Sequence, residues 1–303
     1  MSTKARIWLG VGLYLALLIG LILILGNEGR NESFQPQNEF KLDPWIEITI
    51  GGIDLSINKA VFYLLLASGL TIGAMMFVAN RMQREPNKVQ MAVEVAYDLT
   101  RNNITRGNIE DERLANRWFP FLATLFFFIW FSNIIGFLPL PINTEHKVDI
   151  FGLEVPALAL YAATANLSVP LVLTLIVWFS YHIEGIRAKG FFKYLASWLP
   201  PGLENMNVFA KGFFFVIEAI SRFARLISLS VRLFANILAG HLLLLFMGGG
   251  LAVLLGVAAL GLLTFPLAFA FFLLEVGLIA TLQAFIFSTL TAIYIGGATA
   301  ESH

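Results

Sequence analysis

Residues 208–247 read VFAKGFFFVIEAISRFARLISLSVRLFANILAGHLLLLFM, an apolar stretch longer than one perpendicular membrane crossing needs. The rest of the chain has the same character. Of its 303 residues 58% are hydrophobic and only 13% are charged, and the mean hydropathy is +0.77. Soluble domains carry about 25% charged residues. The sequence therefore predicts an all-α, polytopic membrane protein.

Long apolar windows recur along the chain, and we expect six membrane-embedded segments. They are Ile7–Leu25, Lys59–Ala79, Trp118–Leu138, Leu160–Tyr181, Val208–Met247 and about Leu251–Ile295. The first is interpreted as an uncleaved span rather than a signal peptide, because no A-x-A pattern follows it. The fourth carries Asn166 and Pro170 internally. The last two exceed one crossing, so strong tilt or a surface portion must absorb their length.

Two polar segments separate the first three spans. Asn27–Asn58 contains Pro36, Pro44 and Gly51-Gly52 and is predicted to be an external loop. The second segment, Arg81–Arg117, is charged. Its apolar residues follow helical spacing after Pro86, and they include Val89, Val93, Ala96 and Leu99. We expect this segment to form an amphipathic helix at the membrane surface.

The basic residues outside the spans are unevenly distributed. Thirteen of them fall on one side of the alternating topology: Lys4, Arg6, Arg81, Arg84, Lys88, Arg101, Arg106, Arg113, Arg117, Arg187, Lys189, Lys193 and Lys211. Only Arg30, Lys41 and Lys147 fall on the other. Because cytoplasmic loops retain positive charge, both termini are predicted to be cytoplasmic.

Several classes of function find no support in the sequence. The chain has no cysteine, which excludes disulfides and thiolate metal sites. It contains no G-x-x-x-x-G-K-[ST] phosphate loop, no H-E-x-x-H motif and no nucleophile elbow. We therefore expect no catalytic site, cofactor or metal. The absence of an internal repeat also argues against an inverted-repeat transporter.

Polar residues gather in the last two spans. They are Glu218, Arg222, Arg225, Ser228, Arg232, Asn236 and His241 in the fifth, and Glu275, Thr281 and Gln283 in the sixth. A charge at bilayer depth costs about 2.5–3.5 kcal/mol on insertion scales, so such residues commonly mark an ion path. For the first three, two interpretations stay open: solvated interfacial charges that pair one turn apart, or functional groups.

Arg232 lies 21 residues beyond Lys211, which is about 30 Å along a straight helix. It cannot easily reach the cytoplasmic surface, and its own helix offers no carboxylate within one turn. Its partner is therefore either Glu275 or an acid of another subunit. Small residues near it (Ser228, Ala235, Ala239 and Gly240) would let a facing backbone approach closely. For the alanines and the glycine taken alone, simple packing against the sixth span is the favoured explanation.

An antiparallel hairpin of these two spans would place Arg232 level with Gln283 and His241 level with Glu275. This register requires a turn spread over Gly248–Pro266 rather than one confined to Gly248–Gly250. A histidine and a glutamate at one depth can relay protons, and we favour that hypothesis. The alternative is that His241 is a structural histidine with satisfied hydrogen bonds.

LSVRLFANILAGH (residues 229–241), followed by LQAFIF and LTAIYI, resembles subunit a of the F-type ATP synthase. The match is specific at Arg232, Asn236 and Gly240, spaced four and four, and at Gln283-Ala284-Phe285. It extends to Glu218 and to Arg225 with Ser228, where the family has similar residues.

The resemblance implies a non-catalytic stator subunit with two offset half-channels, through which protons reach and leave carboxylates on a rotating ring. Arg232 would separate the half-channels, with Asn236 and Gln283 supporting it. His241 and Glu275 would line the outer half-channel, and Glu218 the cytoplasmic exit.

The partners implied are the c-subunit ring facing Arg232, peripheral stalk subunit b, the rest of the synthase and the lipid bilayer, but no nucleic acid. The helix after Pro86 would meet the stalk or the ring. Residues 1–58 would add a transmembrane helix and an external loop to a subunit a-like domain, residues 59–303, whose ring-facing hairpin spans about 208–295. The implied location is a bacterial plasma (inner) membrane, with an organellar energy-coupling membrane as alternative.

Two departures from the family pattern concern the outer half-channel. Many members have an acid where His241 stands and a histidine near Glu275, so the pair is exchanged here. Glu275 also precedes Gln283 by eight residues where the family usually has seven, and one residue rotates a helical side chain by about 100°. A competing hypothesis is a stand-alone ion-coupled transporter in which Arg232 binds an anionic substrate.

Overall fold

The computed structural model describes residues 40–81, 88–141, 147–150, 153–156, 158–199, 207–250, 253 and 258–300, together with Trp8, Gly12, Leu13, Ala16, Ile19 and Gly20. The predicted first span, Ile7–Leu25, therefore lies mostly outside the described residues. Within them, five helices are long and apolar enough to cross a membrane. The all-α membrane architecture is confirmed.

The helical elements, in chain order, are α2 (Lys59–Arg81), α3 (Lys88–Asp98), η2 (Leu99–Arg106), α4 (Glu112–Gly136), η3 (Ala163–Ala165), α5 (Ser168–Lys189), α6 (Phe191–Ala196), α7 (Val208–Leu245), η4 (Phe246–Gly250), α9 (Ala258–Leu274), η5 (Glu275–Ile279) and α10 (Ala280–Thr299). Of these, η2, η4 and η5 are π-helical. The predicted spans at Lys59–Ala79, Trp118–Leu138 and Val208–Met247 correspond to α2, α4 and α7.

The fourth predicted span is wrong in its position. The helix α5 begins at Ser168, eight residues after the predicted start, and continues to Lys189. Asn166 lies before the helix, where its Oδ1 accepts a hydrogen bond from the Ser168 N–H. Pro170 is the third residue of α5, in the first turn, where the missing N–H has no intrahelical acceptor to lose. Asn166 and Pro170 therefore mark the N-terminal end of α5 rather than positions inside a span.

Short antiparallel hairpins occupy two of the connections. In the first, β1 (Pro44–Ile46) pairs with β4 (Ile57–Asn58), and β2 (Thr49–Ile50) pairs with β3 (Ile53–Asp54). Gly51 and Gly52 join β2 to β3 with φ of 60° and 85°, the left-handed geometry of a two-residue hairpin turn. In the second, β5 (Leu140–Pro141) pairs with β8 (Leu158–Ala159), and β6 (Lys147–Ile150) pairs with β7 (Leu153–Pro156).

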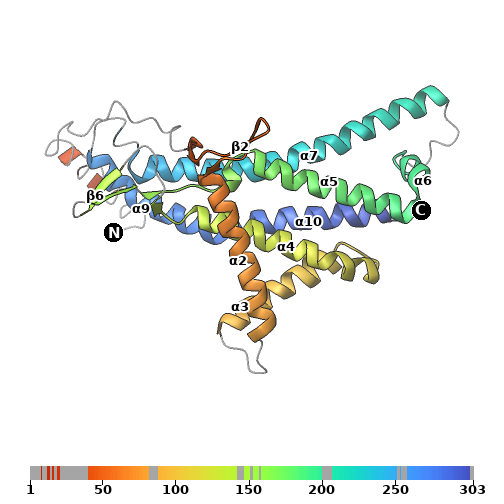
Figure 1. Ribbon diagram of the computed structural model, residues 1–303, viewed down its shortest axis with the longest axis horizontal. Coiled ribbons are helices and arrows are strands. Elements are labelled where there is room, and N and C mark those ends of the chain that lie inside the picture. The colour runs from red at the N-terminus through yellow and green to blue at the C-terminus, as the bar shows by residue number, and fades with distance from the viewer. Residues whose placement is uncertain are drawn as a thin grey trace.

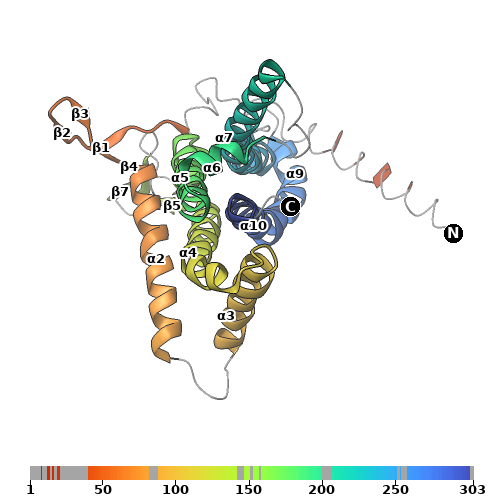
Figure 2. The ribbon, with the colours of Figure 1, turned by 90° about the vertical axis from the view of Figure 1, so that its right-hand side faces the viewer.

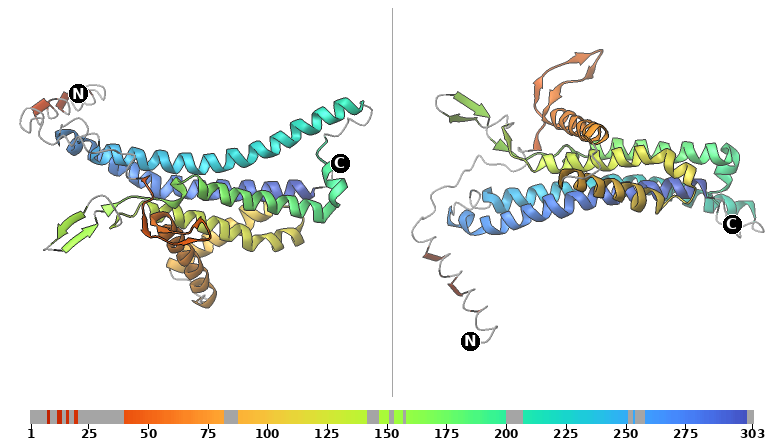
Figure 3. Two further views of the ribbon diagram at one scale, coloured as in Figure 1. Left: turned by 45° about the horizontal axis from the view of Figure 1, so that its top comes forward. Right: turned by 90° about the horizontal axis from the view of Figure 1, so that it is seen from below.

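The long helices α4, α5, α7 and α10 run along the longest dimension of the molecule, and α2 lies crosswise to them (Figure 1). Both views of Figure 3 show the same arrangement. Figure 2, which looks along the long helices, shows α2 at one edge of the bundle and α7 with α9 at the opposite side. A flat bilayer cannot lie perpendicular both to α2 and to the long helices. A bilayer that α2 crosses directly is therefore crossed obliquely by the others.

The core lies where α10 packs between α4 and α5. Its fully buried residues come mainly from α4, α5, α7 and α10 and include Leu122, Ile129, Val177, Leu233, Ile237, Phe287 and Ile295. The predicted surface helix is present as α3 followed by η2. Its residues Ala96 and Leu99 pack against this core, whereas Met91 and Val95 are exposed. The apolar face of the segment thus covers protein at its C-terminal end.

Candidate functional site

One face of α7 is exposed along several turns and is named here the α7 stripe. Its residues recur at helical spacing: Phe223, Ala224, Ile227, Ser228, Val231, Arg232, Ala235, Asn236 and Ala239. The opposite face, with Leu229, Leu233 and Ile237, is buried in the core. The stripe alternates bulky apolar residues with small ones, so a second helix can approach closely beside Arg232.

Arg232 has no partner among the residues that the structure describes. It makes no hydrogen bond or ion pair there, and its side chain is exposed. Of the two partners considered from the sequence, Glu275 is therefore not in contact with it. A guanidinium keeps its charge at any accessible pH, and exposure on an apolar surface at bilayer depth is costly.

His241 faces inward on the same helix and is 2% exposed. Its Nδ1 lies 2.9 Å from the carbonyl oxygen of Ile237, and its Nε2 lies 2.9 Å from that of Gly136 at the end of α4. Its ring stacks on Phe137 with the centroids 4.5 Å apart. Carbonyl oxygens only accept hydrogen bonds. Both contacts are therefore made together only when the imidazole carries a proton on each nitrogen.

Glu275, in the facing helical run, contacts Gly240, the residue that precedes His241. Its carboxylate sits against Gly240, where a Cβ atom would be 2.5 Å from the carboxyl carbon and from Oε2. The side chain is 6% exposed, and Oε2 has no hydrogen-bond partner within the described part of the chain. No ion pair joins Glu275 to His241 in that part either. The predicted hairpin, which puts Glu275 at the depth of His241, is supported, but the two side chains make no direct contact of the kind predicted among the described residues.

The turn of the hairpin falls within the predicted range. The helix α7 ends at Leu245 and is followed by η4, in which Gly249 is non-helical with a φ of 146°, and α9 begins at Ala258. Across the turn, Thr264 Oγ1 donates a 2.7 Å hydrogen bond to the carbonyl of Met247. The turn is therefore not confined to Gly248–Gly250.

The one-residue offset between Glu275 and Gln283 coincides with a break in the α-helix. A π turn, η5, occupies Glu275–Ile279 between them, and Gln283 is buried with 5% exposure. Both side chains thus face the protein interior. Asn236 and Ser228, in contrast, lie exposed on the α7 stripe. No hydrogen bond joins Arg232 to Asn236 or Gln283 in the residues described.

Glu218 lies nearer the N-terminal end of α7 and pairs with two arginines. Its Oε1 is 3.2 Å from Arg222 and 3.8 Å from Arg225, which confirms the pairing expected one turn apart. The Arg222 guanidinium lies 4.6 Å from the ring centroid of Trp198, and that of Arg225 lies 5.8 Å from the Tyr294 ring. Each of the two arginines is therefore held by an aromatic residue from outside α7.

Behind these arginines lies a buried aromatic group that the sequence did not reveal. His182 of α5, 8% exposed, makes a 2.7 Å hydrogen bond to the hydroxyl of Tyr194. The Tyr194 ring occupies the space beside Gly185, where a Cβ would lie 2.2 Å from Cε2. Burial raises the pKa of Tyr194, although Arg222 opposes the shift.

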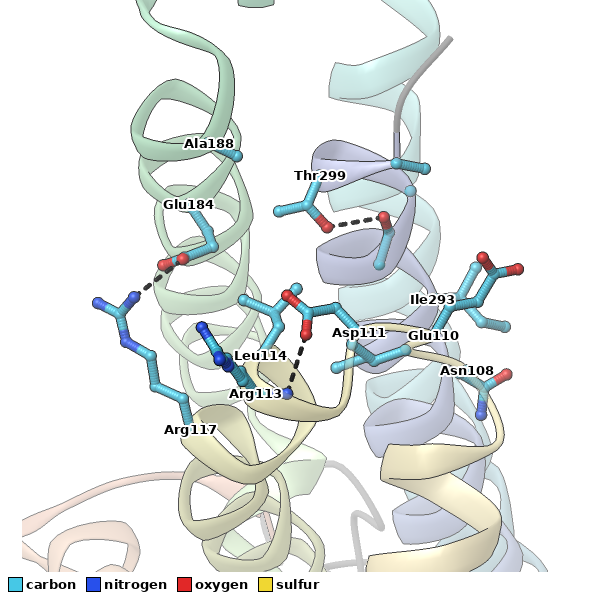
Figure 4. A pocket seen from close by; sticks show the side chains of 14 residues that line it. Asn108, Glu110, Asp111, Arg113, Leu114, Arg117, Glu184, Ala188, Ile293 and Thr299 are labelled. Atoms are coloured by element: carbon cyan, nitrogen blue, oxygen red, sulfur yellow. Dashed lines mark hydrogen bonds and ion pairs between the residues drawn. The ribbon is translucent and has the colours of Figure 1, made fainter. Parts of the chain in front are cut away.

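A pocket of about 740 Å³ opens at the same end of the bundle, between the start of α4 and the ends of α5 and α10. Figure 4 shows Arg117 directed at the buried carboxylate of Glu184, with an N–O distance of 3.1 Å. Arg187 lies 3.7 Å from the other oxygen of Glu184. Arg117 and Glu184 are 67 residues apart in the chain, so no sequence pattern links them. The charges of the pocket lining were missed for this reason.

These features define an all-α integral membrane protein with ionisable residues inside its bundle, the class to which ion-translocating subunits belong. The family model described as ATP synthase A chain matches residues 61–296. The chain belongs to the ATP synthase subunit a family.

Curated relatives agree along most of the chain. ATP synthase subunit a of Rubrobacter xylanophilus is 33% identical over 250 residues, which cover 82% of this chain and 87% of that protein. The Campylobacter hominis protein of the same name is 37% identical over 78% of this chain and 88% of its own. ATP synthase subunit a of Hyphomonas neptunium is 31% identical, and the match covers 89% of this chain and 98% of that protein. The hypothesis of a stand-alone transporter is not supported by these matches.

Proposed function

We propose that this chain forms two offset half-channels in the membrane sector of an F-type ATP synthase. Protons would enter from outside, reach a carboxylate on the rotating c ring, and leave to the cytoplasm after nearly a full turn of the ring. Arg232, exposed in the middle of the α7 stripe and without a partner in the part of the chain that the structure describes, carries this proposal. Its missing counter-charge is supplied by a chain that packs on the stripe.

The chemistry of Arg232 fits a barrier between the half-channels. A permanent cation attracts the deprotonated ring carboxylate and releases it when that carboxylate takes up a proton. Because the guanidinium does not itself lose a proton, it cannot pass one directly between the two channels. Asn236 lies one turn along the same stripe and is available to the ring side chain by hydrogen bonding. We assign Gln283 of the facing helix the role of supporting Arg232 in the assembled membrane sector, since no hydrogen bond joins the two among the described residues.

His241 and Glu275 form the outer half-channel in this proposal. Glu275 is the proton-carrying acid, since one of its oxygens is buried without a partner and a proton or a water molecule would satisfy it. His241 holds its position through two backbone carbonyls beside it. Glu218, which pairs with Arg222 and Arg225, lies on the cytoplasmic exit in this proposal, with Ser228 further along α7.

The proposed partners follow from the same surfaces. The c ring packs on the α7 stripe, and peripheral stalk subunit b is a partner of the remaining surface, with α3 as one candidate contact. Residues 59–303 form the subunit a-like domain with its ring-facing hairpin at about 208–295, and residues 1–58 precede it. We place the protein in a bacterial plasma membrane with both termini cytoplasmic, from the distribution of its basic residues.

Substitution of Arg232 by alanine tests the proposal. In inverted membrane vesicles that contain the assembled synthase, Arg232→Ala should abolish ATP-driven acidification while subunit composition stays normal. Ile176→Ala, an exposed position of α5 outside the α7 stripe, is the control and should pump as the parent does. Vesicles that acidify normally with Arg232→Ala would refute the role assigned to the arginine.

A further inference from the structure

Glu275 and Gln283 lie in one continuous helical run and are eight residues apart. In an unbroken α-helix, eight residues turn the chain by about 800°, which leaves two side chains about 80° apart around the axis. Such a helix could not direct both side chains at the same neighbours. Yet they are 6% and 5% exposed.

The π turn η5 removes this conflict. Within it the Ala280 N–H donates to the carbonyl of Glu275, five residues earlier, instead of to the residue four earlier. A π turn accommodates one residue more than the corresponding α-helical stretch. The eight residues from Glu275 to Gln283 therefore advance around the axis as about seven would, or roughly 700°, which is within about 20° of two full turns. The two side chains share a face.

The inner side of the turn is fixed to α4. Trp130 Nε1 donates a 3.0 Å hydrogen bond to Thr281 Oγ1, and Asn133 Nδ2 lies 3.5 Å from the carbonyl of Ala280. Asn133 is held in turn by Thr164, whose hydroxyl donates to its Oδ1 over 2.8 Å. These contacts begin directly after the π turn, so they anchor the helix that carries Gln283.

The outer side of the turn contacts none of the residues that the structure describes. Leu278 is 60% exposed, and a Cβ at Gly277 would meet no atom within 4 Å among the described residues. The extra residue is therefore accommodated where it displaces nothing. On the inner side, the carboxylate of Glu275 remains against Gly240.

We propose that η5 is a compensating device: its π turn absorbs the additional residue between Glu275 and Gln283, so that Glu275 stays turned toward Gly240 of α7 while α10 keeps its own contacts with α4. This inference rests on the proposed function, in which Glu275 carries protons. Its structural consequence is unusual. Removing one residue from the turn should convert it to regular α-helix and leave Glu275 and Gln283 where they are.

The experiment is deletion of Gly277 in the complete synthase. Because the chain has no cysteine, spin labels can be placed at two exposed pairs, Ile176→Cys with Leu273→Cys before the turn and Ile176→Cys with Ile293→Cys after it. Both distances, measured by double electron–electron resonance, should equal those of the undeleted chain, and ATP-driven pumping should be retained. Deletion of Leu278, which also lies in η5, should give the same distances and the same pumping. It replaces the Gly277 deletion if that variant fails to assemble.

Deletion of Leu290 is the matched control, because α10 is regular there and cannot absorb the loss. It should shift the distance to position 293 and abolish pumping. The inference is overturned if deletion within η5 changes either distance, or if pumping is lost although both distances stay. Failure of the proposed function is recognised separately, in the undeleted chain, by a Glu275→Gln variant that conducts protons normally.

Discussion

At the scale of single residues, the contact between Gly240 and Glu275 defines the buried part of the site. The sequence predicted that the two helices meet at this level, because residue numbers in an antiparallel hairpin add to a constant. It could not predict the partner of His241, since Gly136 is 105 residues away in the chain. The histidine is engaged by two carbonyls, in keeping with the structural alternative considered for it.

We predict that Gly240→Ala slows proton transport. The added methyl group would lie 2.5 Å from the carboxylate of Glu275 and must displace it. Overpacking of this kind costs about 1–3 kcal/mol. Where about 1.4 kcal/mol of that cost raises the barrier to proton transfer at the displaced carboxylate, the rate of ATP-driven pumping falls by about tenfold. Gly248→Ala, where a Cβ meets no atom within 4 Å in the described residues, is the control. Equal pumping by both variants would contradict the close approach.

Glu275→Gln should slow proton entry. The amide retains the shape of the side chain but cannot release a proton to the next carrier. The measurement is passive proton conductance of membranes after removal of the catalytic head, with Glu110→Gln, an exposed acid of the pocket, as a comparison. Conductance equal to that of the parent would count against a channel role for Glu275.

At the scale of elements, long uninterrupted apolar runs made α2, α4 and α7 predictable from sequence, because length and hydropathy are local properties. The start of α5 and the turn η5 were not predictable. The start of α5 depends on how the preceding η3 segment packs on α4. Gly136 of α4 approaches Ala162 so closely that a Cβ on Gly136 would lie 2.3 Å from the Cβ of Ala162. The turn η5 depends on contacts of Trp130 and Asn133 across 151 and 147 residues of chain.

Pro170→Ala tests the corrected start of α5. In the first turn of a helix, proline costs little, so the substitution should change the stability of the subunit by less than about 1 kcal/mol. A proline inside the helix would cost about 3 kcal/mol, and its removal would then be strongly stabilising. The thermal midpoint of the solubilised synthase distinguishes the two cases. A large increase would restore the helix start predicted from the sequence.

At the scale of the whole molecule, topology follows from charge placement and is testable with a chain that lacks cysteine. Leu55→Cys, 54% exposed in the first hairpin, should react from outside with a membrane-impermeant thiol reagent in intact cells. Glu110→Cys, at the pocket, should react only after the membrane is opened. The reverse pattern of labelling would place both termini outside.

The length of α7 has a mechanical consequence. Its 38 residues extend over roughly 57 Å, and its buried face rests on α5, η3 and α10. A rotor that drags sideways on the stripe would load this helix as a beam supported along one side. The force would pass through side-chain packing into α5, η3 and α10 rather than bend α7. Toward its N-terminus the stacking of Trp198 on Phe215 is one of few lateral supports, so stiffness there would be lowest.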